Sequence, residues 1–239
     1  NKNCRRLPDS PDSEAKICDT GELSIVSPDF FLILDPPADL QTNMAKDRAM
    51  FEELKKGSGL PALRIYRWIE PCISAGFGIP LSSPCLLELG LPLTKRPTGG
   101  GVVIHQPEDE ITIALAHRRE RGLAITELYR KIHEPFLGVL KKLGIEASML
   151  MTCPKACSSP SGLPFCFDSP VLYDLVCAGK KILGGGLRLG GPAFLYQGTL
   201  KWPGLDPETL TNALAADAPF IKAWGNPIIQ KELDKEVCS

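Results

Sequence analysis

A tight-turn signal between two apolar runs constrains the fold of this chain more than any other single feature. Leu172–Cys177 and Lys181–Leu183 flank Ala178-Gly179, and this pattern predicts a β-hairpin whose two strands are antiparallel. Three further runs have the length and composition of strands, namely Phe30–Asp35, Ala62–Ile69 and Ala193–Trp202. We therefore expect a sheet in which several neighbouring strands are antiparallel.

Helical periodicity is clearest over residues 126–143, where apolar side chains recur at three- and four-residue spacing. Thr126 is the expected N-cap of this helix. Pro135 lies inside the periodic stretch, so it should kink the helix or divide it into two shorter ones.

Two further helices are expected from their start signals. One begins at Thr42 or Asn43 and ends before Gly57, a residue type that commonly terminates helices. The other begins at Asp206-Pro207, a capping residue followed by a first-turn proline, and runs to about Trp224. Strands and helices thus alternate along the chain, which favours an α/β fold.

The remaining segments are connections or short strands. Residues 71–94 contain four prolines and are expected to form an irregular connection with at most one short helix. Gly101–His105 and Ile111–His117 are expected to pair as a second hairpin. The loop over 147–168 is long enough to suggest a function, and 147–165 is our candidate for a moving lid.

Length and charge narrow the class of protein. A chain of 239 residues with 44% hydrophobic residues can form one sizeable core, so we expect a single domain over 23–239 after a flexible N-terminal arm, 1–22. The expected fold is a single α/β domain with a mixed, mostly antiparallel sheet flanked by helices. The net charge of −1 gives no global attraction for nucleic acid or an anionic membrane. No apolar run is long enough to span a bilayer and no secretory signal is visible, so we expect a cytoplasmic protein.

The nine cysteines are odd in number and scattered, which argues against a disulfide framework. Cys153, Cys157 and Cys166 lie near one another in the sequence, but no CxxC pair occurs and no metal site is expected. Cys166, near the end of the long loop, is a candidate nucleophile, because thiolates are the strongest side-chain nucleophiles near neutral pH. From the residues alone, a buried structural cysteine is the alternative.

Two glycine-rich tracts allow the backbone to approach a ligand closely. In Lys95–His105, the triplet Gly99–Gly101 follows Arg96, which can form a two-pronged bond to phosphate or carboxylate, and Thr98. The alternative is a glycine-rich turn before a strand, and the residues alone do not decide between the two.

The second tract is Gly184–Gly186, which follows Lys180 and Lys181. Lys180 is interpreted as the solvated tip of the hairpin. Lys181 begins the returning strand, where its charge could stabilise an acyl group under attack.

Five segments, in order, resemble the lipoate–protein ligase and octanoyltransferase family, which shares its catalytic domain with biotin–protein ligases. They are Asn43-Met44-Ala45 with Asp47; Tyr66, Trp68, Pro71, Ser74 and Gly76; Arg96–His105; Gly179–Ile182 with Gly184 and Arg188; and Gln197–Leu200. The chain departs from the family pattern at Ile79, at Gln106, and at Gly185-Gly186, where Ser-Ala is common.

The resemblance implies a biotin/lipoate ligase-like fold with a tunnel for a medium-length acyl chain. It implies that Lys181 is catalytic and contacts the acyl carbonyl. The residues that it assigns to substrate binding are Trp68, Arg96, Thr98, Gly99, Gly100, Gly101, His105, Gly184, Gly185, Gly186, Gln197, Gly198 and Thr199. It also implies that the two glycine tracts hold an adenylate where one is used.

The implied activity is the transfer of a lipoyl or octanoyl group onto a lysine of a lipoyl domain, in 2-oxoacid dehydrogenases or the glycine-cleavage H protein. Cys166-Phe167-Asp168-Ser169-Pro170, followed by Tyr173-Asp174-Leu175, resembles the cysteine octanoyltransferases, which take the acyl group from an acyl carrier protein through a thioester. The expected state is a monomer with no tightly bound cofactor.

Three alternatives remain open. An ATP-dependent ligase, which needs ATP and Mg²⁺, is favoured by the third glycine, Gly101. A non-catalytic acyl- or lipoyl-domain-binding protein is suggested by the departures from the family pattern. A biotin ligase is disfavoured by the overall motif match.

Overall fold

The computed structural model describes residues 30–152, 164–168 and 170–231. The predicted arm, 1–22, lies outside these residues, as does most of the predicted lid. Among the described helices, none combines the length and the apolar character needed to cross a membrane.

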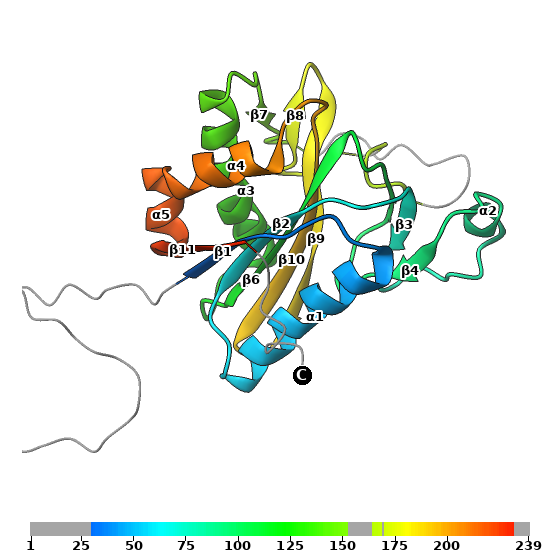
Figure 1. Cartoon of the computed structure of the whole chain (residues 1–239), viewed down its shortest axis with the longest axis horizontal. Helices are drawn as coiled ribbons and strands as arrows, with labels where there is room; N and C mark the ends of the chain where they lie inside the picture. The colour runs from blue at the N-terminus through cyan, green and yellow to red at the C-terminus, as the bar shows by residue number, and fades with distance from the viewer. Residues whose placement is uncertain (1–29, 153–163, 169, 232–239) are drawn as a thin grey trace, which may run out of the picture.

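A large mixed sheet forms the centre of the molecule (Figure 1). Its eight strands lie in the order β11 (Pro227–Gln230), β1 (Phe30–Leu34), β2 (Ala62–Tyr66), β6 (Glu110–Arg118), β10 (Ala193–Lys201), β9 (Lys180–Gly190), β8 (Leu175–Cys177) and β7 (Ser148–Met149). Strand β1 is parallel to β11 and β2, and the other neighbours are antiparallel. The prediction of a mixed, mostly antiparallel sheet is confirmed.

The hairpin with which the sequence argument began is also confirmed. Strands β8 and β9 are antiparallel, and their turn residues Ala178 and Gly179 have φ of 47° and 76°. Two positive φ values in succession are what a two-residue hairpin turn of the type I′ class requires. This hairpin carries Lys181 at the start of β9.

A second, three-stranded sheet corrects two predictions. It consists of β4 (Leu93–Lys95), β3 (Cys72–Ala75) and β5 (Val102–His105), so residues 71–94 hold one strand and most of a second as well as the short helix α2 (Pro84–Leu87). The predicted pairing of Gly101–His105 with Ile111–His117 is wrong. Strand β5 pairs with β3, whereas β6 pairs with β2 and β10 in the large sheet. The intervening residues therefore turn a corner between sheets.

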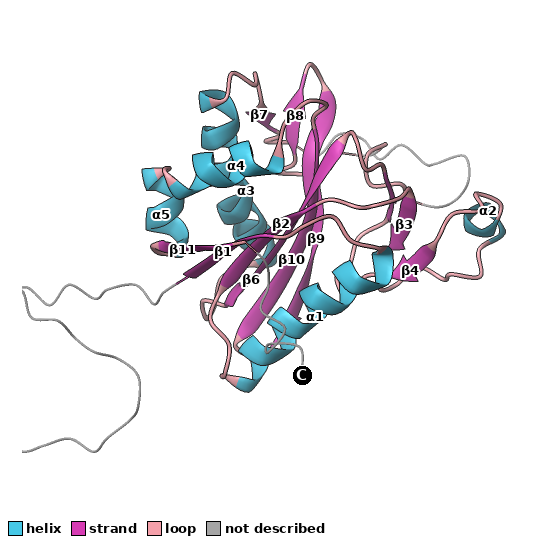
Figure 2. Ribbon diagram, viewed as in Figure 1, coloured by secondary structure: helices cyan, strands magenta, loops and turns pink. Residues whose placement is uncertain are grey.

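Helices cover both faces of the large sheet (Figure 2). On one face, α1 (Leu40–Lys56) packs Met44, Phe51 and Leu54 against alternate strand residues such as Ala62 and Ala114. On the other face, α3 (Ile125–Lys142), α4 (Pro207–Ala215) and α5 (Ala218–Trp224) enclose the larger core. The period of two along each strand thus supplies both cores.

The helix boundaries differ from prediction at four points. Asp39, not Thr42 or Asn43, caps α1 by accepting from the backbone N–H groups of the first turn, whereas the predicted end at Gly57 is confirmed by its φ of 84°. Helix α3 begins after Ala124 without a side-chain cap, so Thr126 lies inside it.

The other two differences concern breaks within helices. Pro135 was predicted either to kink this helix or to divide it; it lies inside an unbroken α3, so the division is wrong. The predicted last helix is divided at Asp217, whose carboxylate accepts from the Phe220 N–H at 2.8 Å and so begins α5.

Candidate active site

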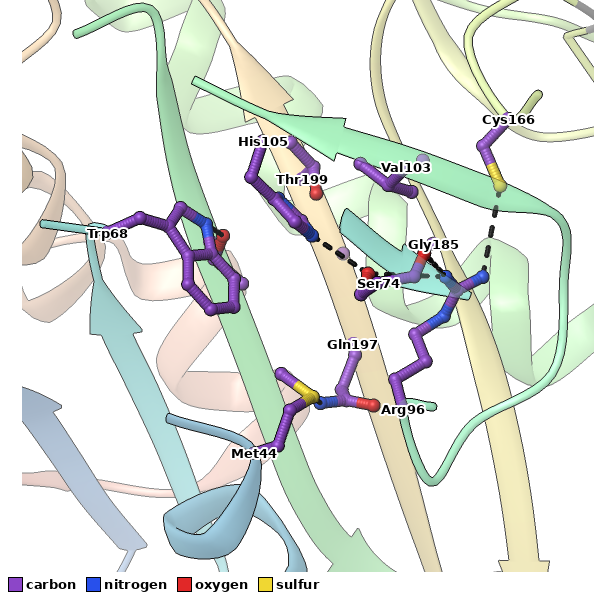
Figure 3. Close-up of a pocket in the computed structure, with 13 residues that line it drawn as sticks. Met44, Trp68, Ser74, Arg96, Val103, His105, Cys166, Gly185, Gln197 and Thr199 are labelled. Carbon is purple, nitrogen blue, oxygen red and sulfur yellow. Dashed lines mark hydrogen bonds between the residues drawn. The ribbon is translucent and has the colours of Figure 1, made fainter. Parts of the chain in front are cut away.

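A small cavity lies where the two sheets meet α1 (Figure 3). It has a volume of about 20 Å³. This is room for about one water molecule, so the tunnel implied by the resemblance is not formed at the width of an acyl chain in the described residues. Nine predicted site residues line the cavity: Trp68, Arg96, His105, Cys166, Gly184, Gly185, Gln197, Gly198 and Thr199. Met44, Ser74, Val103 and Thr112 complete it.

The strand β5 fixes the position of Cys166. The Val102 N–H donates to the Pro164 carbonyl at 2.8 Å, and the Cys166 N–H donates to the Val102 carbonyl at 2.9 Å. These two bonds extend the edge of the small sheet and place the half-buried thiol at the cavity wall.

Lys181 lies directly beside this segment. Its Nζ donates to the Cys166 carbonyl oxygen at 2.9 Å and pairs with Asp174 Oδ2 at 2.8 Å, and its side chain is only 4% exposed. A Cβ at Gly184 would lie 2.1 Å from Lys181 Cε, so the glycine makes space for the lysine. The two predicted catalytic residues are therefore brought together, although Lys181 lies behind the cavity wall.

Asp174 and Tyr129 support Lys181, and neither was among the predicted site residues. The Tyr129 hydroxyl donates to Asp174 Oδ1 at 2.8 Å and accepts from the Gly185 N–H at 2.8 Å. Burial raises the pKa of the Tyr129 hydroxyl well above its usual range, which keeps it a neutral donor. Asp174 had a signal in the sequence, since it belongs to the Tyr173-Asp174-Leu175 stretch noted above.

Below this group, His133 bridges the Tyr173 carbonyl and the Tyr196 hydroxyl, each at 2.7 Å. Its complete burial lowers the pKa of His133 to about 4. The imidazole is therefore neutral at physiological pH, and its protonation must oppose folding.

Arg96 is buried and directed toward protein groups. It donates to the carbonyls of Ser74, at 3.0 Å, and of Gly99, at 2.8 Å, and its second terminal nitrogen lies 3.9 Å from Cys166 Sγ. Burial lowers the pKa of the Arg96 guanidinium, but arginine remains charged in proteins. A fixed positive charge thus faces the candidate nucleophile.

Close backbone contacts account for the glycines of the first tract. A Cβ at Gly101 would lie 1.8 Å from the Pro164 oxygen, and one at Gly76 would lie 2.0 Å from the Gly100 oxygen. Gly186 likewise lies against the Gly99 oxygen, at 2.3 Å from a Cβ. Thr98, Gly99, Gly100, Gly101 and Gly186, all predicted to bind substrate, do not line the cavity; they hold its walls together.

A buried polar cluster orients His105. Its Nδ1 lies 2.5 Å from Glu110 Oε1 and its Nε2 lies 2.8 Å from Ser74 Oγ. The Trp68 indole N–H donates to Thr112 at 2.9 Å and its ring lies 4.3 Å from the imidazole. Glu110 was missed because only its partners across two sheets reveal its role.

Gln197 connects the cavity to α1. Its Oε1 accepts from the Thr98 hydroxyl at 2.9 Å, and its Nε2 donates to Asp47 Oδ2 at 2.6 Å. Asp47 is completely buried and also accepts from Arg64 and Tyr66. Asp47, which belongs to the first-helix motif, therefore supports the first glycine tract through Gln197 and Thr98.

Metal ligation finds no support in the part of the chain that the structure describes, where no three His, Cys, Asp or Glu side chains gather suitably. Cys153 and Cys157 lie outside it. Burial raises the pKa of the Cys72 thiol to about 12, consistent with an inert core cysteine.

Sequence comparison places most of the chain in one family. The lipoyl protein ligase A/B catalytic domain matches residues 39–227. The octanoyltransferase LipM of Moorella thermoacetica is 31% identical over 68% of this chain and 61% of its own length, and that of Kyrpidia tusciae is 32% identical over 70% and 64%. The chain thus spans less than two thirds of the length of these curated relatives.

Structural comparison agrees on the fold. Lipoate-protein ligase A bound with ATP superimposes with a TM-score of 0.67 at 19% identity, covering 88% of this chain and 91% of that one. A bi-partite lipoate protein ligase from Thermoplasma acidophilum, described with its E2 lipoyl domain, gives 0.65 at 17% identity, covering 89% of each chain. Because that family's model matches residues 39–227, most of the sequence, this chain belongs to the lipoyl protein ligase A/B catalytic-domain family.

Proposed function

We propose that the protein transfers an octanoyl or lipoyl group onto a lysine of a lipoyl domain through a thioester on Cys166. The carrying observation is that Cys166 Sγ lines the cavity while the Lys181 ammonium is bonded to the carbonyl of the same residue. A nucleophile therefore lines the cavity, and a charged group that can stabilise the developing oxyanion lies directly behind the wall that carries it.

The chemistry proceeds in two balanced steps. The Cys166 sulfur attacks the carbonyl carbon of an acyl thioester, and the bond to the donor sulfur breaks; the donor thiol leaves with the proton that Cys166 lost. The amine of the acceptor lysine then attacks the Cys166 thioester, an amide forms, and the sulfur regains a proton. Arg96, 3.9 Å away, stabilises negative charge on the sulfur before the first step and after the second.

The family to which the chain belongs suggests the partners. The acceptor would be the lipoyl domain of a 2-oxoacid dehydrogenase or the glycine-cleavage H protein, and the donor an acyl carrier protein. A cytoplasmic monomer fits these partners. The LipM relatives, named octanoyltransferases, favour octanoyl as the transferred group.

The ligase alternative loses its main support in the structure. The third glycine had suggested a nucleotide phosphate close to the loop, but Gly101 is needed because Pro164 occupies that space. The N–H groups of Gly99 and Val102 are also bonded to protein carbonyls, those of Leu187 and Pro164. We therefore propose that transfer requires neither ATP nor Mg²⁺.

The test compares two cysteine variants. Octanoyl carrier protein and a lipoyl domain are incubated without ATP with the wild type, Cys166→Ser and Cys177→Ser, since Cys177 is another half-buried free thiol. We expect transfer to be lost only in Cys166→Ser. ATP-dependent acylation by Cys166→Ser at the wild-type rate would exclude the thioester mechanism, and stable acyl binding without transfer by any form would identify a non-catalytic protein.

A further inference from the structure

A basic groove lies on the outer side of the first glycine tract, with a volume of about 320 Å³. Arg48 of α1, Lys95 of β4 and Arg188 of β9 contribute its exposed or half-exposed cations, and the buried Arg96 forms its floor. Its one carboxylate, Glu52, lies 2.6 Å from Lys55 Nζ and is therefore already paired. The chain as a whole carries a net charge of −1, so this positive charge is local.

The exposed ring of Phe77 lies close to two of these cations. Phe77 is 64% exposed, and the Lys95 ammonium and the Arg188 guanidinium lie 5.8 Å and 5.7 Å from its ring centre. Arg188 also donates to the Pro97 carbonyl at 3.3 Å. One bond leaves most of its five N–H donors free for an anion, and cation–π contacts hold both side chains near the ring.

Arg96 lies between this groove and the cavity that Cys166 lines. It lines both the groove and the cavity, and its guanidinium lies 3.9 Å from Cys166 Sγ. A molecule whose acyl carbonyl reaches Cys166 while its anionic end lies in the groove must extend past Arg96. The two ends of such a donor are therefore separated by a linker.

We propose that this groove binds the phosphate of the acyl donor, in the form of a phosphodiester separated from the thioester by a flexible arm. This inference rests on the proposed function. An acyl-adenylate fits less well, because a single oxygen joins its phosphorus to the acyl carbon, so the phosphate cannot lie beyond Arg96 while the carbonyl meets Cys166. Phe77 offers an apolar surface for the arm, and the cations neutralise the phosphate.

The first test measures binding without turnover. Isothermal titration compares 4′-phosphopantetheine, pantetheine and AMP on the wild type, Arg48→Gln, Lys95→Gln and the double variant. Lys56→Gln, on the same helix but outside the groove, controls for loss of charge. We expect phosphopantetheine to bind better than pantetheine, and each groove variant to weaken it about 5-fold, or about 25-fold together.

The second test measures transfer from two donors that differ only in the phosphate, octanoyl-phosphopantetheine and octanoyl-pantetheine. The groove variants should raise KM for the first and leave the KM for the second unchanged. Equal affinity for phosphopantetheine in the wild type and the double variant would overturn the proposal. So would AMP binding that exceeds phosphopantetheine binding and is lost in the groove variants.

The two tests also separate this inference from the proposed function. If neither donor is used, the proposed function fails, yet phosphate-dependent binding that disappears in the double variant would still support the subsite. If both donors are used with the same KM by the wild type, the function stands and the subsite is refuted.

Discussion

Replacing Gly101 by alanine should separate the glycine tract from the segment that carries Cys166. The new Cβ would lie 1.8 Å from the Pro164 oxygen and 2.8 Å from its carbonyl carbon. Because these neighbours are backbone atoms, they cannot turn aside as a flexible side chain would. The Pro164–Cys166 segment must therefore move away from β5.

The cost follows from the bonds that this movement breaks. The segment is held to β5 by two backbone hydrogen bonds, one from the Val102 N–H and one to the Val102 carbonyl. At about 1 kcal/mol each, these two hydrogen bonds stabilise the position of the segment against β5 by about 2 kcal/mol. Their loss should therefore lower the fraction of molecules in which Cys166 is correctly placed by about 30-fold. Global stability should change less, since the main cores lie elsewhere.

The assay is the rate of thioester formation on Cys166 with excess octanoyl donor, followed by intact mass. Gly99→Ala is the matched control, because a Cβ there meets only the Leu187 oxygen, at an ordinary 3.6 Å. We expect Gly101→Ala to be about 30-fold slower and Gly99→Ala to stay close to the wild type. Equal rates for Gly101→Ala and the wild type would refute the packing explanation of the third glycine.

Three further variants test the supporting structure. Lys181→Met leaves the buried Asp174 carboxylate without its cation, so it should abolish lipoyl-domain acylation and cost about 3 kcal/mol in urea unfolding; retained transfer would remove Lys181 from the site. Gly185→Ala places a Cβ 2.2 Å from the backbone oxygen of Gln197 and 2.7 Å from Gly198 Cα, so it should separate β9 from β10. We expect it to lower the free energy of unfolding by about 2 kcal/mol and to reduce transfer more than 10-fold. Transfer at the wild-type rate would contradict this. His133 has its pKa lowered from 6.5 to about 4 by burial, so the stability it confers is complete above pH 6.5 and declines as the pH falls toward 4, by about 3 kcal/mol. His133→Gln should flatten the pH dependence of the unfolding free energy over that range, and an unchanged slope would show that another group dominates.

Local patterns predicted elements well where the signal was self-contained. The Ala178-Gly179 turn and the strands on either side needed no distant partner, and neither did the end of α1 at Gly57. The break before α5 was missed, although it too had a local signal. Asp217-Ala218-Pro219 has a capping residue and an early proline, much like the pair that begins α4.

Long-range pairing could not be read in the same way. Alternating apolar residues in β5 and β6 fit a hairpin as well as they fit two different sheets, and only the tertiary structure shows the corner between them. Gly186 and Gly101 were interpreted as openings for a ligand. The atoms that require them to be glycine are the Gly99 and Pro164 oxygens. Each of these atoms belongs to a segment that is distant in the sequence from the glycine that it contacts.

The site residues also divide into those that a local motif predicts and those that only the tertiary structure reveals. Family motifs led to Lys181 and to the nine cavity-lining residues, Cys166 among them, because short segments carry them. Of the groups that hold them, Tyr129 meets Asp174 from a distant part of the chain, and Glu110 reaches His105 across the corner between two sheets. Such contacts have no local pattern.

The most direct measurement is mass spectrometry of the protein after incubation with octanoyl carrier protein in the absence of ATP and of any lipoyl domain. The account predicts one added octanoyl group, released by neutral hydroxylamine and located on Cys166, and its transfer to a lipoyl domain supplied afterwards. A protein that stays unmodified under these conditions, yet acylates the lipoyl domain when octanoate and ATP are provided, would contradict it.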